Sequence, residues 1–459
     1  MGRGLTRREA LRAGAGATGA LLAARYAGVL NDARAAGLRL PDALPLPGLP
    51  MGTPHPEMPF DHVVVVMQEN HSFDNYLGML PRRGQRKADG FDFDRHGHPT
   101  NSNPYQDGSI TVHRAASLCQ PSGPGQSWRS THLQVDGGRM DGFARQSPAT
   151  MVYWDESQLP FYYSLAKTFC AGDRWFASAP CQTYPNRRFL LAGTAFGLIS
   201  TDTSSVTQDP PNGTIVDRLN AAGVSWRDYF TDVPATGVIA SIPIKHPANI
   251  SPVAQFYADC AAGTLPAVSF VDSDIGIASV VSDATLGAVN APFAQTVSAQ
   301  NEDEEGPADI SLGENFVHRV VSAVLRSPLW PRILLVWTYD EHGGYYDHVP
   351  PPAAIPPDAI PPKLGPNDPP GGYDSYGVRV PAVVVSGHAH RHAVTSTVHD
   401  HTSILATIER KWNLPAMTHR DANATTLMDF LDSRVTFPEP PRLAAPSDLV
   451  ASERTCSFD

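Results

Sequence analysis

The chain has 459 residues, of which 42% are hydrophobic and 18% charged. This is enough to bury a sizeable core, as one large α/β domain or two smaller ones. Asp and Glu outnumber Lys and Arg by 46 to 35, which gives a net charge of -11 and argues against a nucleic acid partner, because a polyanion would require a basic face.

The first 36 residues differ in composition from the rest. Arg7 and Arg8 precede an Ala-rich, uncharged run, and Ala33-Arg34-Ala35 offers a small-x-small cleavage site. This pattern resembles a twin-arginine export signal; the alternative is a short N-terminal helix. We therefore expect a signal peptide over 1–36, use of the twin-arginine export machinery, and a secreted or cell-envelope protein. The apolar run is too short for a confident membrane span, so we expect no integral span in the mature protein.

A Pro-rich linker is predicted over 37–59, and it leads into the apolar, β-branched run 62–67, which is typical of a buried parallel strand. Four more strands are predicted, at 224–229, 267–271, 333–339 and 380–385. Helical patterns at 185–192, 314–325 and 402–412 lie between them. This alternation predicts a three-layer α/β/α sandwich with a mostly parallel central sheet. The Gly- and Pro-rich stretches 78–138 and 350–373 are expected as long excursions near the active face. A catalytic domain over 60–440 and a C-terminal tail over 441–459 complete the prediction.

Two of the predicted strands are followed at once by carboxylates. Glu69 and Asn70 follow the first strand, and Asp340 and Glu341 follow the strand 333–339. Ligands in open α/β sheets bind at the carboxyl ends of strands, and oxygen ligands suit a divalent cation. The alternative is that these residues are caps and turn formers. An oxygen-rich shell favours Ca, Mg or Mn, while nearby histidines keep Zn or Fe open, so we expect one or more divalent ions of unassigned identity.

The helix predicted after Thr183 contains Pro185, Asn186 and Arg187. Proline suits the first turn of a helix, and a helix N-terminus favours a phosphate. Thr183 would therefore hold its hydroxyl where a nucleophile attacks, with Asn186 and Arg187 as phosphate ligands. Thr183 fits equally well as a plain N-cap.

Histidines supply the candidates for acid or base chemistry near neutral pH. The candidates are His132, His342 and His348, and for each a structural role is an equal alternative. Further possible site residues are Asp347, Asp400 and His401. The run of alternating histidines at 388, 390 and 392 could bind a metal or form a solvated loop.

Four segments together resemble the phosphoesterase family of bacterial phospholipases C, with acid phosphatases and plant non-specific phospholipases C as relatives. They are QENHSFDNYLG (68–78), TYPNRRFLLAGT (183–194), TYDEHGGYYDHVPPP (338–352) and DHTSILATIE (400–409). The resemblance implies an alkaline-phosphatase-like fold, a metal held by the four strand-end residues, and Thr183 as a nucleophile that forms a transient phospho-enzyme. Two positions depart from the family, because Gln126 and Glu305 stand where it usually has histidines.

The expected function is an exported, metal-dependent phospholipase C that hydrolyses a phospholipid to diacylglycerol and a phosphorylated head group. The alternatives are a phosphomonoesterase resembling acid phosphatases, which would act on a small phosphate ester, and a non-catalytic relative that binds phosphate or phospholipid. The five cysteines fit no metal-ligand spacing, and their odd number leaves at least one unpaired if the others form disulfides.

Overall fold

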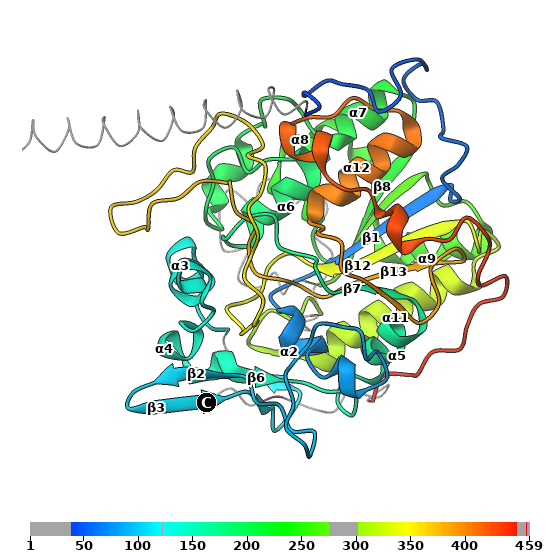
Figure 1. Ribbon diagram of the computed structural model, residues 1–459. Coiled ribbons are helices and arrows are strands. Elements are labelled where there is room, and N and C mark those ends of the chain that lie inside the picture. The colour runs from blue at the N-terminus through cyan, green and yellow to red at the C-terminus, as the bar shows by residue number, and fades with distance from the viewer. Residues whose placement is uncertain (1–37, 122, 275–301, 448–455, 457–459) are drawn as a thin grey trace, which may run out of the picture.

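The computed structural model of the protein describes residues 38–121, 123–274, 302–447 and 456. The predicted signal peptide lies outside these residues, and so does most of the predicted C-terminal tail. An eight-stranded sheet forms the centre of the molecule, in the order β14-β7-β13-β12-β1-β10-β8-β9 (Figure 1). Its strands are β1 (His62–Gln68), β7 (Cys170–Gly172), β8 (Trp226–Phe230), β9 (Ile250–Pro252), β10 (Val268–Asp272), β12 (Ile333–Tyr339), β13 (Ala382–Ser386) and β14 (Ala393–Thr395).

The predicted mostly parallel sheet is confirmed. Strands β1, β8, β9, β10 and β12 run parallel, β14 runs parallel to β7, and β13 lies antiparallel between β12 and β7. All five predicted strands form within two residues of their expected ends. Every residue of β12 is buried, as expected for a strand covered by helices on both faces.

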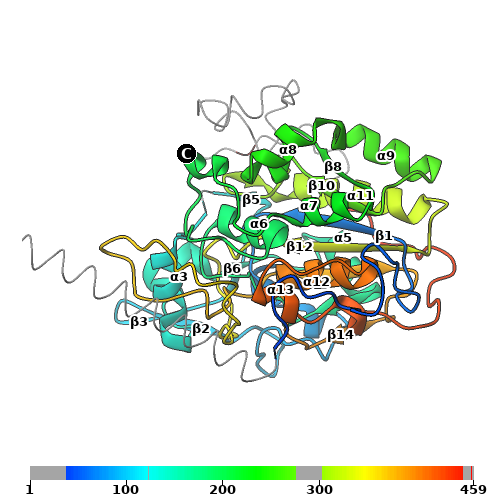
Figure 2. The same cartoon turned by 90° about the horizontal axis from the view of Figure 1, so that it is seen from above.

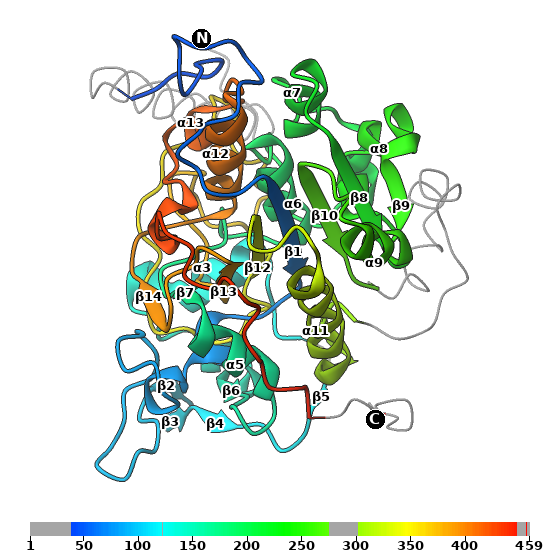
Figure 3. The same cartoon turned by 90° about the vertical axis from the view of Figure 1, so that its right-hand side faces the viewer.

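Helices cover both faces of the sheet, so the three-layer prediction is confirmed (Figure 3). One layer holds α6, α7, α12 and α13, and the other holds α5, α9 and α11. The bounds of the helices are α2 (Phe73–Leu77), α3 (Trp128–Val135), α4 (Phe143–Gln146), α5 (Pro160–Thr168), α6 (Thr183–Ala192), α7 (Ile215–Ala221), α8 (Ser241–Lys245), α9 (Val253–Ala262), α11 (Ile310–Arg326), α12 (His401–Trp412) and α13 (His419–Asn423).

Helix α11 illustrates how the pattern of the sequence determines the packing. Its buried residues include Phe316, Val317, Val320, Val321 and Val324, which recur at the three- and four-residue spacing of one helix face. Its N-cap, the side chain of residue 309, accepts a hydrogen bond from the backbone N–H of residue 311. Each large side chain of this face contributes about 1.5–3 kcal/mol by leaving water, so α11 is held mainly by its apolar face.

The two predicted excursions meet at the end of the molecule where β1 and β12 finish. Figure 2 shows α3 beside the segment 350–373, and Trp128 Nε1 donates a hydrogen bond to the Pro369 carbonyl at 2.9 Å. The first excursion also carries the short strands β2 (Ser102–Tyr105), β3 (Gly108–Thr111), β4 (His113–Arg114) and β5 (Cys119–Gln120), and β4 pairs with β6 (Val152–Tyr153), which follows the excursion. The β5 strand pairs with β11 (Ala308–Asp309).

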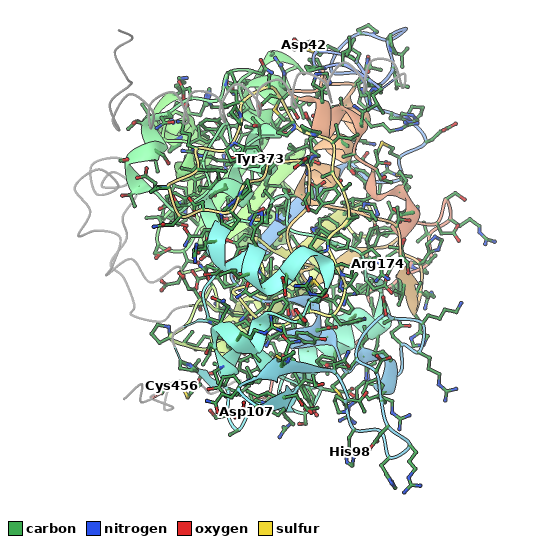
Figure 4. All side chains as sticks on the ribbon, turned by 60° about the vertical axis from the view of Figure 1, so that its left-hand side comes forward. Asp42, His98, Asp107, Arg174, Tyr373 and Cys456 are labelled. Carbon is green, nitrogen blue, oxygen red and sulfur yellow. A yellow bond between two sulfur atoms is a disulfide. The ribbon has the colours of Figure 1, made fainter. Side chains whose placement is uncertain are left out.

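The ends of the described chain are fastened to the domain. Asn413 Nδ2 donates hydrogen bonds to three backbone carbonyls of the predicted linker, at residues 46, 49 and 50. Cys456 forms a disulfide with Cys119, at the end of the molecule far from Asp42 (Figure 4). The other three cysteines, at 170, 181 and 260, are buried and free. Within the described residues, no helix combines the length and apolar character needed to cross a membrane.

Candidate active site

Strands β1 and β12 bring the four predicted metal ligands together. The two strands are parallel neighbours in which Gln68 pairs with Tyr339, so Glu69 and Asp340 leave the sheet side by side. The backbone N–H of Asp340 donates to the Gln68 carbonyl at 3.0 Å, and the N–H of Asn70 donates to Asp340 Oδ1 at 3.3 Å. The ends of the two strands therefore form one structural unit.

Tight backbone packing fixes the turns that carry these ligands. Asn70 has a positive φ of 71°, a conformation that asparagine tolerates better than most residues. Gly343, two residues after Glu341, has a φ of 63°, and a Cβ there would lie 2.1 Å from the Asn70 carbonyl oxygen. Glycine is therefore required at 343, because any side chain would push the two turns apart.

The carboxylates are buried and close to one another. Burial raises the pKa of Asp340 well above its usual range, and the negative charge of Glu69 raises it further. Burial likewise raises the pKa of Glu341 well above its usual range. Arg187 offsets part of this charge, since its Nη2 lies 3.0 Å from Glu69 Oε1 and its Nε lies 3.7 Å from Asp340 Oδ2.

Three oxygens of this group are buried without a hydrogen-bond partner among the described residues. They are Asn70 Oδ1, Asp340 Oδ2 and Glu341 Oε1. A buried polar atom without a partner costs about 1–3 kcal/mol, and three such atoms at one place indicate that a further group completes the site. An amide oxygen with carboxylates is a donor set for a hard divalent cation, so the residues present fit the predicted metal.

Helix α6 begins beside these carboxylates. Its first residue is Thr183, and its N-cap is Gln182, so the alternative that Thr183 is the N-cap is wrong. Arg187 follows Thr183 by four residues and therefore lies on the same helix face one turn later. The predicted nucleophile is thus carried by the helix that carries the arginine paired with Glu69.

Asn186, a predicted phosphate ligand, is fully buried. Its Oδ1 accepts a hydrogen bond from the Ala179 backbone N–H at 3.0 Å, and its Nδ2 lies within hydrogen-bond distance of the carbonyls of Ala179, Cys181 and Gln182. The side chain therefore holds the turn that leads into Thr183 and presents no remaining N–H to a phosphate.

Two of the predicted histidines contact the predicted metal ligands Asp340 and Glu341. His401 Nε2 donates to the Asp340 backbone carbonyl at 2.7 Å, and burial lowers the pKa of His401 to about 4, so the ring is neutral. His342 Nε2 lies 2.9 Å from Gln134 Oε1, and its Nδ1 lies 3.1 Å from Glu341 Oε2. Burial lowers the pKa of His342 to about 3. His401 therefore holds the backbone of a predicted ligand in place, and His342 packs against the side chain of another.

His348 and Asp347 belong to a separate ion-pair network. The Nδ1 of His348 lies 2.6 Å from Asp74 Oδ2, and its Nε2 lies 3.2 Å from Asp89 Oδ1. The buried Arg379 pairs with both Asp74 and Asp347. Burial alone would lower the pKa of His348, but the adjacent carboxylates raise it to about 10. At neutral pH the ring is therefore charged, with both N–H groups held by carboxylates.

Two other predicted site residues also make local contacts. His132 Nδ1 donates to the Trp128 carbonyl at 2.7 Å, in α3, and burial lowers the pKa of the ring. Asp400 is the N-cap of α12 and accepts hydrogen bonds from Ser178 and Thr402. The histidines at 388, 390 and 392 are absent from the potential metal-binding groups found in the described part of the chain.

Asp303 and Glu305 were not predicted from the sequence as candidate metal ligands, although Glu305 stands where the family usually has a histidine. Their carboxylates and that of Glu69 offer oxygens that all lie within 4.8 Å of one another, and the Glu69 backbone N–H donates to the Asp303 carbonyl at 2.9 Å. Both belong to the acidic run 302–305, which stands out in a chain with few charges. This acidic run is the sequence feature from which the two residues could have been predicted.

A cleft of about 350 Å³ opens over this group. Its lining includes Asn70, Gln182, Gln126 and Glu305. The two positions at which the sequence departs from its family therefore face the same cleft, beside the residue that precedes Thr183.

A cluster of tyrosines fixes the segment that carries Asp303 and Glu305. The buried carboxyl group of Glu304 accepts hydrogen bonds from the hydroxyls of Tyr76, Tyr162 and Tyr339, at 3.0, 2.6 and 2.5 Å. Burial raises the pKa of Glu304 to about 8. Because Tyr339 ends β12, this cluster joins the acidic segment to the strand that carries Asp340.

Residues 60–415 match the model of the phosphoesterase family, a range that includes all four motif segments. The non-specific phospholipase C1 of Arabidopsis thaliana is 32% identical over 420 residues, which cover 85% of this chain and 74% of that protein. The phospholipase C A of Mycobacterium tuberculosis is 27% identical, with 84% and 79% covered. The predicted family resemblance is confirmed.

Solved structures give weaker similarities. A protein in the alkaline phosphatase superfamily from Vibrio parahaemolyticus is 12% identical, with 77% of this chain and 80% of that chain covered and a TM-score of 0.34. A phosphonate monoester hydrolase of Agrobacterium radiobacter is 10% identical, with 81% and 77% covered and a TM-score of 0.37.

Proposed function

Because the chain belongs to the phosphoesterase family, and is therefore a hydrolase acting on phosphoric ester bonds, we propose that it is a metal-dependent phospholipase C with Thr183 as its nucleophile. The single observation that carries the proposal is the position of Thr183, which starts α6 one turn before the arginine that pairs with Glu69. The names of the relatives in Arabidopsis and Mycobacterium support a phospholipid as the substrate.

The proposed reaction has two steps. First, the Thr183 hydroxyl oxygen bonds to phosphorus and the bond from phosphorus to the leaving alcohol breaks, so that diacylglycerol leaves with its oxygen and gains a proton. Second, water attacks the phospho-threonine, which releases the phosphorylated head group and restores the hydroxyl. The start of α6 favours an anion, and Arg187, one turn later, carries a positive charge next to the predicted ligands Glu69 and Asp340.

The divalent cation, held by Glu69, Asn70, Asp340 and Glu341, would supply positive charge that lowers the pKa of a nearby hydroxyl and stabilises a phosphoryl oxygen. His401 fixes the backbone of Asp340, and His342 packs against Glu341. Both rings are neutral at pH 7, so they add no positive charge that would compete with the cation.

Export through the twin-arginine route belongs to the same proposal. It is supported by Arg7, Arg8 and the following apolar run, and by the disulfide between Cys119 and Cys456, since disulfides persist in oxidising compartments. Substitution of both arginines with lysine should retain the protein in the cytoplasm. Unchanged export of that variant would contradict this part of the proposal.

Turnover on defined substrates tests the proposed function. The purified protein, supplied with Mn²⁺, Ca²⁺, Mg²⁺ or Zn²⁺, is assayed on phosphatidylcholine vesicles, on p-nitrophenylphosphorylcholine and on p-nitrophenyl phosphate. Release of diacylglycerol, with hydrolysis of the diester, is the expected result. Hydrolysis of the monoester alone would replace it with the phosphomonoesterase alternative. Activity on no substrate despite bound metal would leave the non-catalytic binding protein.

A further inference from the structure

A second group of carboxylates adjoins the predicted metal ligands. Oxygens of Glu69, Asp303 and Glu305 lie within 4.8 Å of one another. The Glu305 backbone N–H donates to Asp303 Oδ1 at 2.9 Å, which fixes the Asp303 side chain relative to the Glu305 backbone. Glu69 thus lies in one group with Asp303 and Glu305, and its negative charge also acts on Asp340 and Glu341.

Unpartnered buried atoms point to a ligand within this second group. Asp303 is fully buried, and its Oδ2 has no hydrogen-bond partner among the described residues. Asn70, a predicted ligand of the first cation whose buried Oδ1 is likewise without a partner, lines the cleft together with Glu305. A buried carboxylate with a purely structural role would normally have a hydrogen-bond partner. Coordination of a cation would satisfy these unpartnered oxygens.

Charge balance favours two cations over one. The carboxylates of Glu69, Asp303, Glu305, Asp340 and Glu341 carry five negative charges when ionised. The guanidinium of Arg187, which contacts Glu69 and Asp340, supplies one positive charge. With one divalent cation the site would keep a net charge of minus two, which would repel an anionic substrate. With two divalent cations the net charge of the site would be zero.

The segment that carries the second group is held rigidly. The three tyrosine hydroxyls on Glu304 fix the residue between Asp303 and Glu305, and Gln68 Nε2 donates to the Glu302 carbonyl at 2.8 Å. Ligands on such a fixed backbone need little reordering when a cation binds.

We propose that Asp303 and Glu305 hold a second divalent cation, with Glu69 as the ligand shared between it and the first. The proposal rests on the proposed function for the first cation. Paired cations in phosphoryl-transfer sites lie about 3.5–4 Å apart and stabilise both the attacking and the leaving oxygen. The second cation would place a positive charge in the cleft where Gln126 and Glu305 replace the expected imidazoles.

Measurement of Mn²⁺ binding to the full chain tests the proposal of a second cation. Apo-protein is dialysed against Mn²⁺, the bound metal is counted by elemental analysis, and electron paramagnetic resonance reports coupling between adjacent ions. The wild type should bind two ions with a coupled spectrum, as expected of a paired site. Glu305→Gln keeps the shape and removes the charge, so it should bind one ion with an uncoupled spectrum. Glu302→Gln is the matched control, because Glu302 pairs with Arg319 instead, and it should bind as the wild type does.

One ion in the wild type at saturating Mn²⁺, or two coupled ions retained in Glu305→Gln, would overturn the proposal. If Glu305→Gln fails to fold, judged by its circular dichroism, Asp303→Asn is used under the same criteria. A wild type that binds one ion and hydrolyses phosphatidylcholine would overturn the second site alone. A wild type that binds no ion and is inactive would overturn the proposed function as well.

Discussion

Replacement of Asn186 with Ala separates a positioning role from a phosphate contact. Asn186 holds the turn before Thr183 through its Oδ1 contact with the Ala179 N–H and its Nδ2 contacts with backbone carbonyls, the shortest being 2.8 Å to Cys181. We expect Asn186→Ala to lower the free energy of unfolding and kcat, and to leave KM nearly unchanged, because the turn loosens while no substrate contact is lost.

The magnitude follows from the hydrogen bonds that disappear. The buried Ala179 N–H loses its partner, which costs about 1–3 kcal/mol, and the Cys181 carbonyl loses a bond with a net value of about 1 kcal/mol. Alanine favours a helix more than asparagine does, which returns about 0.5 kcal/mol. The expected loss is about 1.5–3.5 kcal/mol. A displacement of Thr183 by about 1 Å would cost about 100-fold in kcat.

Urea unfolding followed by circular dichroism measures the free energy of unfolding. Steady-state hydrolysis of p-nitrophenylphosphorylcholine measures kcat and KM. Asn249→Ala is the matched control, because that side chain makes one hydrogen bond, to the Trp226 carbonyl, and should lose about 1 kcal/mol. A stability within about 0.5 kcal/mol of the wild type, combined with a raised KM and an unchanged kcat, would refute the reasoning and make Asn186 a phosphate ligand.

Two further predictions concern the charged groups. The pKa of His348 is raised from 6.5 to about 10, so its contribution to stability is fully present below pH 6.5 and is lost as the pH rises through 10. The stability of His348→Gln, from urea unfolding between pH 6.5 and 10, should therefore fall less steeply than that of the wild type; equal slopes would contradict the assignment. Glu341→Gln should weaken the first Mn²⁺ affinity at least tenfold in titration calorimetry, since a charged ligand is lost, and unchanged affinity would remove Glu341 from the ligand set.

Much of the fold could be predicted because its main strands are marked by composition. The run 333–339 is apolar or aromatic except at Thr338, as is typical of a strand covered on both faces, and it was predicted to the residue. The strands β7, β9 and β14 were missed because each has three residues, too few to show a pattern. The antiparallel direction of β13 depends on the path of the long loop before it, which no local pattern records.

The candidate site was predictable where its residues follow strands directly. Glu69 and Asp340 were found for that reason. Asp303 and Glu305 come instead from a segment that docks by backbone hydrogen bonds after a long connection, so their nearness to Glu69 is a tertiary contact that spacing cannot predict. The predicted role of His348 depended on its residue type alone, whereas its partner Asp74 comes from a distant part of the sequence.

The central claim is that Thr183 attacks phosphorus. Mass spectrometry of the protein, quenched with acid during turnover of p-nitrophenylphosphorylcholine and then digested, tests it directly. We predict a phosphorylcholine ester on the peptide that contains Thr183, and neither this adduct nor turnover in Thr183→Ala, while Thr207→Ala, an exposed threonine, behaves as the wild type. An adduct on another residue, or turnover that survives in Thr183→Ala, would contradict the account.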